Sequence, residues 1–144
     1  FASVEEAAQA MWAISSSFGP HTREQWLALS RPMLKQMTDA QGGYALHYDP
    51  AIAVPFGAAT QESTLQGEKM LWQLYDNIKA ATLLVRGAQS DLLSPQTAFA
   101  MTQRGPKARL VEFDGVGHAP TFIADDQVNA VASFLLAPWL GPIV

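Results

Sequence analysis

Apolar side chains in the first 78 residues recur mostly at the spacing of an α-helix. Residues 3–17 read SVEEAAQAMWAISSS, with apolar positions near every third or fourth residue. Ser3 followed by Glu6 is the pattern of a capping box, which places the start of a helix there. The stretch FGPH at 18–21 contains a glycine and a proline, so we expect the helix to end before it.

Two more helices are predicted in this part of the chain. The second covers 22–38, with Thr22 as its N-cap, Gln25 at the capping-box position and DAQGG at its end. The third covers 65–78 and should turn four apolar side chains inward: Met70, Leu71, Leu74 and Ile78. Between these helices, YALHYDPAIAVPFG at 44–57 holds two prolines, so we expect a loop with little regular structure.

The pattern changes at residue 81, where short continuous apolar runs replace the helical spacing. ATLLVRG at 81–87 is such a run, closed by a glycine, and KARLVEF at 107–113 is a second. Apolar runs of this length are typical of strands that are buried on both faces of a parallel sheet. We therefore predict two parallel strands in the carboxyl-terminal half.

Helical segments follow each of these strands. SPQTAFAMTQRG at 94–105 places Ser94 at an N-cap and Pro95 at the first helical position. DDQVNAVASFLL at 125–136 has acidic residues in its first turn, where the helix dipole favours them. The order strand, helix, strand, helix with a right-handed crossover predicts a βαβ unit and a covering helix.

Composition narrows the class of protein without naming a function. The 144 residues are 49% hydrophobic and 15% charged, which is enough apolar content for one globular domain or a piece of a larger one. The net charge of −4, without a cluster of basic residues, argues against a nucleic-acid partner. The absence of cysteine excludes a disulfide scaffold and a thiol nucleophile.

The two ends of the sequence give expectations about processing and location. VNAVASFLLAPWLGPIV at 128–144 is interrupted by two prolines, so it predicts a helix ending near Ala137, not a membrane span. The first ten residues lack the basic and apolar regions of a signal peptide, and we expect a cytoplasmic location with no membrane partner. The chain starts at Phe1 instead of methionine, and its organisation favours cutting from a longer protein.

Candidate chemistry lies in the loops after the two predicted strands. Function in parallel α/β sheets is found beyond the carboxyl ends of the strands. GAQSDLLSP carries Asp91 after the first strand, and DGVGHAP carries His118 after the second. If the strands are neighbours, these side chains can meet. A carboxylate that accepts a hydrogen bond from one imidazole nitrogen leaves the other nitrogen as a general base.

Other interpretations of these residues are open at this point. A single loop histidine is more often a surface residue than a catalytic one, and Asp91 could simply favour the start of the following helix. Asp114 competes for the role of the acid. The three histidines, at 21, 47 and 118, lack the spacing of metal ligands, so no metal site is expected.

The two strand regions resemble a known family. TLLVRGAQSDLLSP and ARLVEFDGVGHAPTFIADDQVNAVASFLL are similar to the last part of the α/β-hydrolase fold, over residues 80–137. The resemblance implies a catalytic triad in which Asp91 is the acid and His118 is the base. Residues 1–78 look like the helical cap that such hydrolases insert before these strands, and 79–144 like the carboxyl-terminal part of the core.

The expected fold class is therefore α/β: a helical cap segment followed by a β-α-β-α unit from a parallel α/β-hydrolase sheet. The tryptophans at 12, 26 and 72 fall on apolar helix faces, where core packing is more common than lining a cap pocket.

One part of the family pattern is missing from this sequence. The strand–turn–helix elbow G-x-S-x-G, which carries the nucleophile in serine members, does not occur. The serines all fall in predicted helices, caps or loops: Ser3, Ser15, Ser16, Ser17, Ser30, Ser63, Ser90, Ser94 and Ser133. The oxyanion-hole donors would also belong to the missing half. We expect the chain alone to be inactive.

The sequence thus predicts a carboxyl-terminal fragment of a hydrolase that acts on a small-molecule substrate, an ester or an amide, without a cofactor. Two alternatives remain: a non-catalytic α/β-hydrolase-like binding or assembly protein, or a dehalogenase or epoxide hydrolase with an aspartate nucleophile. The predicted strand at 82–87 would expose an apolar edge, which favours association with the missing amino-terminal half or with a second copy.

Overall fold

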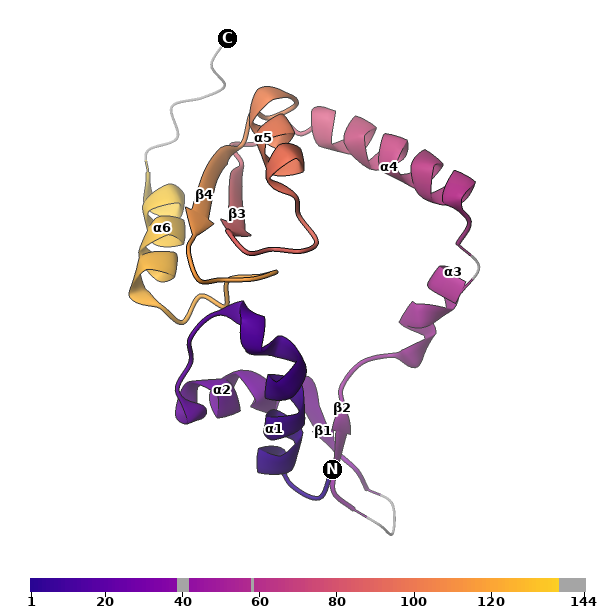
Figure 1. Ribbon diagram of the computed structural model, residues 1–144, viewed down its shortest axis with the longest axis vertical. Coiled ribbons are helices and arrows are strands. Elements are labelled where there is room, and N and C mark those ends of the chain that lie inside the picture. Colours follow the sequence, from indigo (N-terminus) through magenta and orange to yellow (C-terminus); the bar gives the residue numbers. More distant parts are fainter. Residues whose placement is uncertain (39–41, 58, 138–144) are drawn as a thin grey trace.

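The computed structural model describes residues 1–38, 42–57 and 59–137 (Figure 1). The helices are α1 (Val4–Ser15), α2 (Arg23–Ser30), α3 (Val54–Gly57), α4 (Gln61–Asp76), α5 (Pro95–Gln103) and α6 (Asp125–Leu136). The strands are β1 (Leu34–Gln36), β2 (Tyr44–Leu46), β3 (Leu83–Gly87) and β4 (Arg109–Phe113). Figure 1 shows α1, α2, β1 and β2 as one unit and β3, α5, β4 and α6 as another, with α3 and α4 connecting them along the outside.

The predicted starts of the first two helices are confirmed. The Ser3 hydroxyl accepts a hydrogen bond from the backbone N–H of Glu6 at 3.1 Å, as an N-cap does. The Glu6 carboxylate accepts from the backbone of Ala2 at 2.6 Å, one residue before the position expected in a capping box. At α2 the box is complete, because Thr22 and Gln25 each accept from the other's backbone N–H.

The predicted extension of the second helix to residue 38 is wrong. α2 ends at Ser30, a single 3₁₀ turn follows, and β1 then pairs antiparallel with β2, with Leu34 opposite Leu46. Pro32 explains the end of the helix, since it lacks the backbone N–H that would continue the helical hydrogen bonds. The predicted loop at 44–57 is also corrected, because it contains β2, a 3₁₀ turn and α3.

The third predicted helix exists, but its apolar stripe does not face inward. α4 begins at Gln61, four residues before the predicted start, and ends at Asp76. Met70 and Leu71 are 61% and 67% exposed, and Leu74 and Ile78 are exposed as well. Within the described residues the stripe stays exposed, because the contacts that hold α4 lie near its carboxyl end.

The carboxyl end of α4 is fixed to α5 and to the residue after it. The Tyr75 hydroxyl donates to the carbonyl of Met101 at 2.6 Å, and burial raises the pKa of this phenol. The Arg104 guanidinium forms an ion pair with Asp76 and lies 4.3 Å from the ring centroid of Trp72. Its hydrogen bonds hold the pKa of the Asp76 carboxyl below its ordinary value.

The amino-terminal unit has its own small core. Ala7, Ala8 and Met11 from α1 are buried against Trp26 from α2. The indole N–H of Trp26 donates to the carbonyl of Ala8 at 2.7 Å, which satisfies the one polar atom of the ring. Core packing, the role expected for this tryptophan, is therefore observed.

The predicted β-α-β-α order of the carboxyl-terminal half is confirmed. β3 and β4 pair in parallel from Leu83 opposite Arg109 to Gly87 opposite Phe113. Ser94 caps α5 by accepting from the backbone of Thr97 at 3.0 Å. Because the pairing is parallel, both strands end at the same edge. Of the helices in the described ranges, none is both long and apolar enough to span a membrane.

Candidate active site

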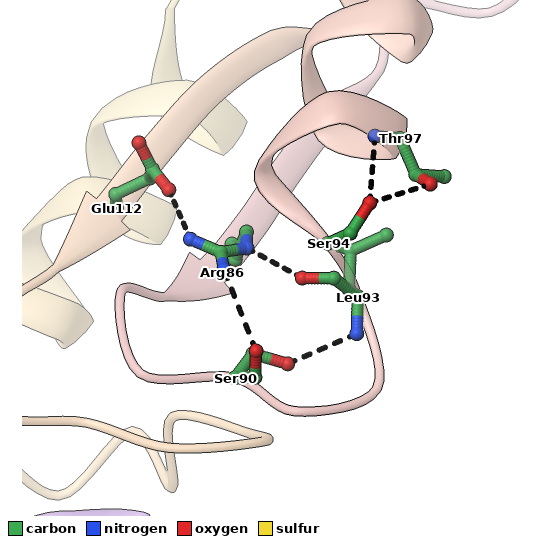
Figure 2. A network of polar contacts seen from close by, with 6 residues as sticks. All are labelled: Arg86, Ser90, Leu93, Ser94, Thr97 and Glu112. Carbon is green, nitrogen blue, oxygen red and sulfur yellow. Dashed lines mark hydrogen bonds and ion pairs between the residues drawn. The ribbon is translucent and has the colours of Figure 1, made fainter.

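The loop that carries Asp91 is fixed by an arginine from inside β3. Arg86 is only 3% exposed, although it stands in an otherwise apolar strand, and it forms an ion pair with Glu112 of β4. Its Nε donates to the carbonyl of Leu93 at 2.7 Å, and Nη2 lies 3.5 Å from the carbonyl of Ser90. Figure 2 shows these contacts converging on one guanidinium. A buried charge needs such partners, so they fix the loop as well as the arginine.

The loop that carries His118 crosses directly over the end of β3. A Cβ atom on Gly87 would lie 2.0 Å from the carbonyl oxygen of Gly117 and 2.4 Å from that of Val116. No side chain fits at such distances, so glycine is required where the loop passes. The backbone N–H of Gln89 donates to the carbonyl of Val116 at 3.0 Å and thereby joins the two loops.

The structure brings the loops of Asp91 and His118 together but does not bond the two side chains. Both are exposed, and each lies two residues after one of the bonded residues, Gln89 and Val116. In the described part of the chain, Asp91 and His118 share no hydrogen bond or ion pair. Asp114, the competing acid, is exposed in the turn directly after β4. Which carboxylate serves His118 stays a prediction at this stage.

The turn between α1 and α2 contacts the histidine loop from the other side. The backbone N–H of Gly117 donates to the carbonyl of Ser17 at 2.5 Å. The rings of Phe18 and His118 lie 6.4 Å apart between centroids and are tilted by 56°. His21 bonds the Thr121 hydroxyl through Nε2 at 2.7 Å. The amino-terminal unit therefore contacts the loop on both sides of His118.

A groove of about 650 Å³ opens between α1 and α2. Trp12, Trp26 and His21 contribute rings to its wall, and these rings pack edge to face at centroid distances of 5.0–6.1 Å. Trp12 and Trp26 thus combine core packing with lining a pocket. Across the residues that the structure describes, no group of three or more histidine or carboxylate side chains could hold a metal ion.

The two serines of the loop that carries Asp91 have structural partners. Ser90 accepts from the backbone of Leu93 at 3.1 Å, and Ser94 caps α5 (Figure 2). Both hydroxyls stabilise the loop between β3 and α5. Neither is therefore a candidate for the nucleophile.

Three residues of this region were not singled out from the sequence. Arg86 carried a signal, because a charged residue within the apolar run LLVRG must find a partner when it is buried. His21 and Thr121 carried none, since they lie 100 residues apart and nothing local relates them.

Replacing Gly87 by alanine should destabilise the protein by roughly 1–3 kcal/mol, because the new methyl group forces the histidine loop away from β3. Chemical denaturation of the purified variant measures this change. The matched control is Gly67→Ala in α4, where a Cβ meets nothing within 4 Å. There we expect stabilisation of about 0.5–1 kcal/mol, since alanine favours helix. Equal stability of both variants would contradict the close crossing at Gly87.

Comparisons with known proteins agree with this geometry. No family model matches the sequence. The 3-hydroxybutyrate-oligomer hydrolase of Cupriavidus necator is 43% identical over 135 residues, which cover 93% of this chain and 46% of that protein. An α/β hydrolase from Novosphingobium aromaticivorans superposes with a TM-score of 0.71 at 32% identity, covering 94% of this chain and 46% of the other.

A more distant likeness shows the same fold. E-2-(acetamidomethylene)succinate hydrolase superposes with a TM-score of 0.68 at 16% identity. The superposition covers 95% of this chain and 47% of that protein. The chain thus spans less than half the length of the proteins it matches. The two superpositions nevertheless cover 94% and 95% of this chain. The chain therefore has the fold of part of an α/β hydrolase.

Proposed function

We propose that this chain is the carboxyl-terminal part of a hydrolase and that Asp91 and His118 are the acid and the base of its triad. The observation that carries the proposal is the joining of their two loops beyond the ends of β3 and β4 by the Gln89–Val116 backbone bond. This edge is where parallel α/β sheets place their functional side chains.

In the proposed reaction, one nitrogen of His118 takes the proton of a nucleophile supplied by the rest of the enzyme. The nucleophile attacks the carbonyl carbon, and His118 then returns the proton to the leaving group. In the second half-reaction His118 takes a proton from the water that attacks the covalent intermediate, and it returns this proton to the nucleophile as the bond between nucleophile and acyl group breaks. Asp91 accepts a hydrogen bond from the other imidazole nitrogen. Both side chains are exposed in their loops, so no core packing opposes the rotation that closes this contact.

We propose an ester as the scissile group, in a short oligomer of a hydroxy acid. The 43% identity to a 3-hydroxybutyrate-oligomer hydrolase supports this substrate class over an amide. Units of such an oligomer are joined by ester bonds, which are cleaved more readily than amide bonds because an alkoxide is a better leaving group than an amide anion. No cofactor is required for this chemistry.

We further propose that an amino-terminal half of the enzyme covers the apolar surface that this chain exposes. On α4, Leu65, Met70, Leu71 and Leu74 are each more than half exposed. Among the described strands β3 pairs only with β4, so its other edge is open. Exposed apolar stripes and open strand edges favour association. The matched relatives are more than twice as long as the chain, which leaves room for such a half.

Substitution in the complete enzyme tests the triad. With an oligomeric 3-hydroxybutyrate ester as substrate, His118→Gln and Asp91→Asn should each lower kcat by about 10³-fold or more with little change in KM. Asp114→Asn is the matched control, because it removes the neighbouring loop carboxylate. This variant should retain activity, since the proposal gives Asp114 no role in the triad. Full activity of His118→Gln would refute the proposal. Loss of activity in Asp114→Asn alone would reassign the acid to Asp114.

Light scattering on the isolated chain tests the proposal that an amino-terminal half covers this apolar surface. The chain should self-associate at micromolar concentration and should form a one-to-one complex when the amino-terminal half is co-expressed. Leu71→Gln should weaken self-association, whereas Gln73→Glu, also exposed on α4, should alter it little. A monodisperse monomer that does not bind the amino-terminal half would contradict the proposal.

A further inference from the structure

We propose that His21 and Thr121 are positioning residues for His118. Through them the amino-terminal unit, and not only β4, sets the place of the imidazole. This inference rests on the proposed role of His118 as the base and concerns how that base is held.

The histidine loop is fixed at two points that flank His118. On one side, the backbone N–H of Gly117 donates to the carbonyl of Ser17 at 2.5 Å. On the other side, the Thr121 hydroxyl bonds Nε2 of His21 at 2.7 Å. Both partners belong to the turn between α1 and α2. A loop segment held at both ends by one short turn keeps its central side chain in place, which is what catalytic geometry requires.

The contact surface is shaped so that the two backbones can approach closely. A Cβ on Gly117 would lie 2.5 Å from the Ser17 carbonyl oxygen and 2.9 Å from its side chain. Gly19 faces Val116 and has a φ of 109°, a conformation that glycine adopts without strain. A side chain at Gly117 would push the turn and the loop apart, and a side chain at Gly19 would strain the backbone of the turn. The close approach of the two backbones therefore depends on a glycine in the turn and on a glycine in the histidine loop.

The anchor on the amino-terminal side is itself rigid. Nδ1 of His21 lies 2.8 Å from the carbonyl oxygen of Gly19, which can only accept, so Nδ1 carries the proton. In the neutral ring Nε2 then accepts from the Thr121 hydroxyl. The ring also packs edge-on against Trp12 and Trp26, at centroid distances of 6.1 and 5.6 Å. Trp26 belongs to the core, so Thr121 is bonded to a side chain that cannot easily turn.

The anchor connects the groove to the loop of the proposed base. His21 lines the groove between α1 and α2 and at the same time bonds Thr121. A movement of the α1–α2 pair therefore displaces the segment that holds His118. This gives the amino-terminal unit a role in positioning the base as well as in covering the site.

Removal of the Thr121 hydroxyl tests the anchor in the complete enzyme. Thr121→Val keeps the shape of the side chain and should lower kcat by about 10- to 100-fold, with KM changed less than twofold, because the base is displaced while substrate binding is retained. Thr121→Ser restores the hydroxyl and should restore kcat. His21→Phe keeps an aromatic ring but loses both hydrogen bonds, and it should behave like Thr121→Val.

The matched control is Thr102→Val in α5, whose hydroxyl donates to the carbonyl of Phe99 at 2.7 Å away from the histidine loop. This variant should keep its kcat. Amide hydrogen exchange at Gly117 and His118 should accelerate in Thr121→Val and not in Thr102→Val.

Normal kcat in Thr121→Val overturns the inference, and so does unchanged exchange at Gly117. His118→Gln, measured beside it, separates the two proposals. If His118→Gln is inactive while Thr121→Val is normal, the anchor fails and the triad stands. If His118→Gln is fully active, the triad fails, and the positioning role of His21 and Thr121 fails with it.

Discussion

The close crossing of backbone over Gly87 is the constraint on which the candidate site depends. β3 and β4 pair in parallel up to Gly87 and Phe113, and the chain then turns back so that Val116 and Gly117 lie on Gly87. A side chain at this position would push the histidine loop off the sheet edge. Because the loop lies flat there, the Gln89–Val116 bond can form and the loops of the proposed acid and base share one edge.

The two loops are held by different means. The loop of Asp91 is fixed from within the sheet, by the guanidinium of Arg86 and its bonds to Glu112 and the Leu93 carbonyl. The loop of His118 is fixed from the amino-terminal unit, by the turn that precedes α2. Among the described residues, the loop of the proposed acid is held by contacts within the carboxyl-terminal unit, whereas the loop of the proposed base is held by both units. A change in how the units meet would act first on the proposed base.

Local signals were enough to predict most of the carboxyl-terminal half. Continuous apolar runs located β3 and β4, and Ser94 with Pro95 located the start of α5. The loops of Asp91 and His118 followed from the parallel order of the strands. The contact between the two side chains did not, because it depends on rotamers that the sequence pattern does not set.

The extension of the second helix overlooked a local signal, Pro32, whereas the other errors arose where structure depends on distant partners. β1 and β2 are three residues each, too short to show alternation, and β2 also bonds the backbone of Phe1. The prediction that the apolar stripe on α4 faces inward is wrong because helical periodicity shows only that one face of a helix is apolar. It does not show what that face contacts. The His21–Thr121 bond joins positions 100 residues apart, so only the folded chain relates them.

The most direct test of the central claim is a double-mutant cycle between positions 91 and 118, measured on ester hydrolysis by the complete enzyme. If the two residues act as one unit, the double variant Asp91→Asn/His118→Gln should be no slower than His118→Gln alone, because the carboxylate acts only through the imidazole. Losses that multiply would show that Asp91 and His118 act independently, and that result would contradict the account.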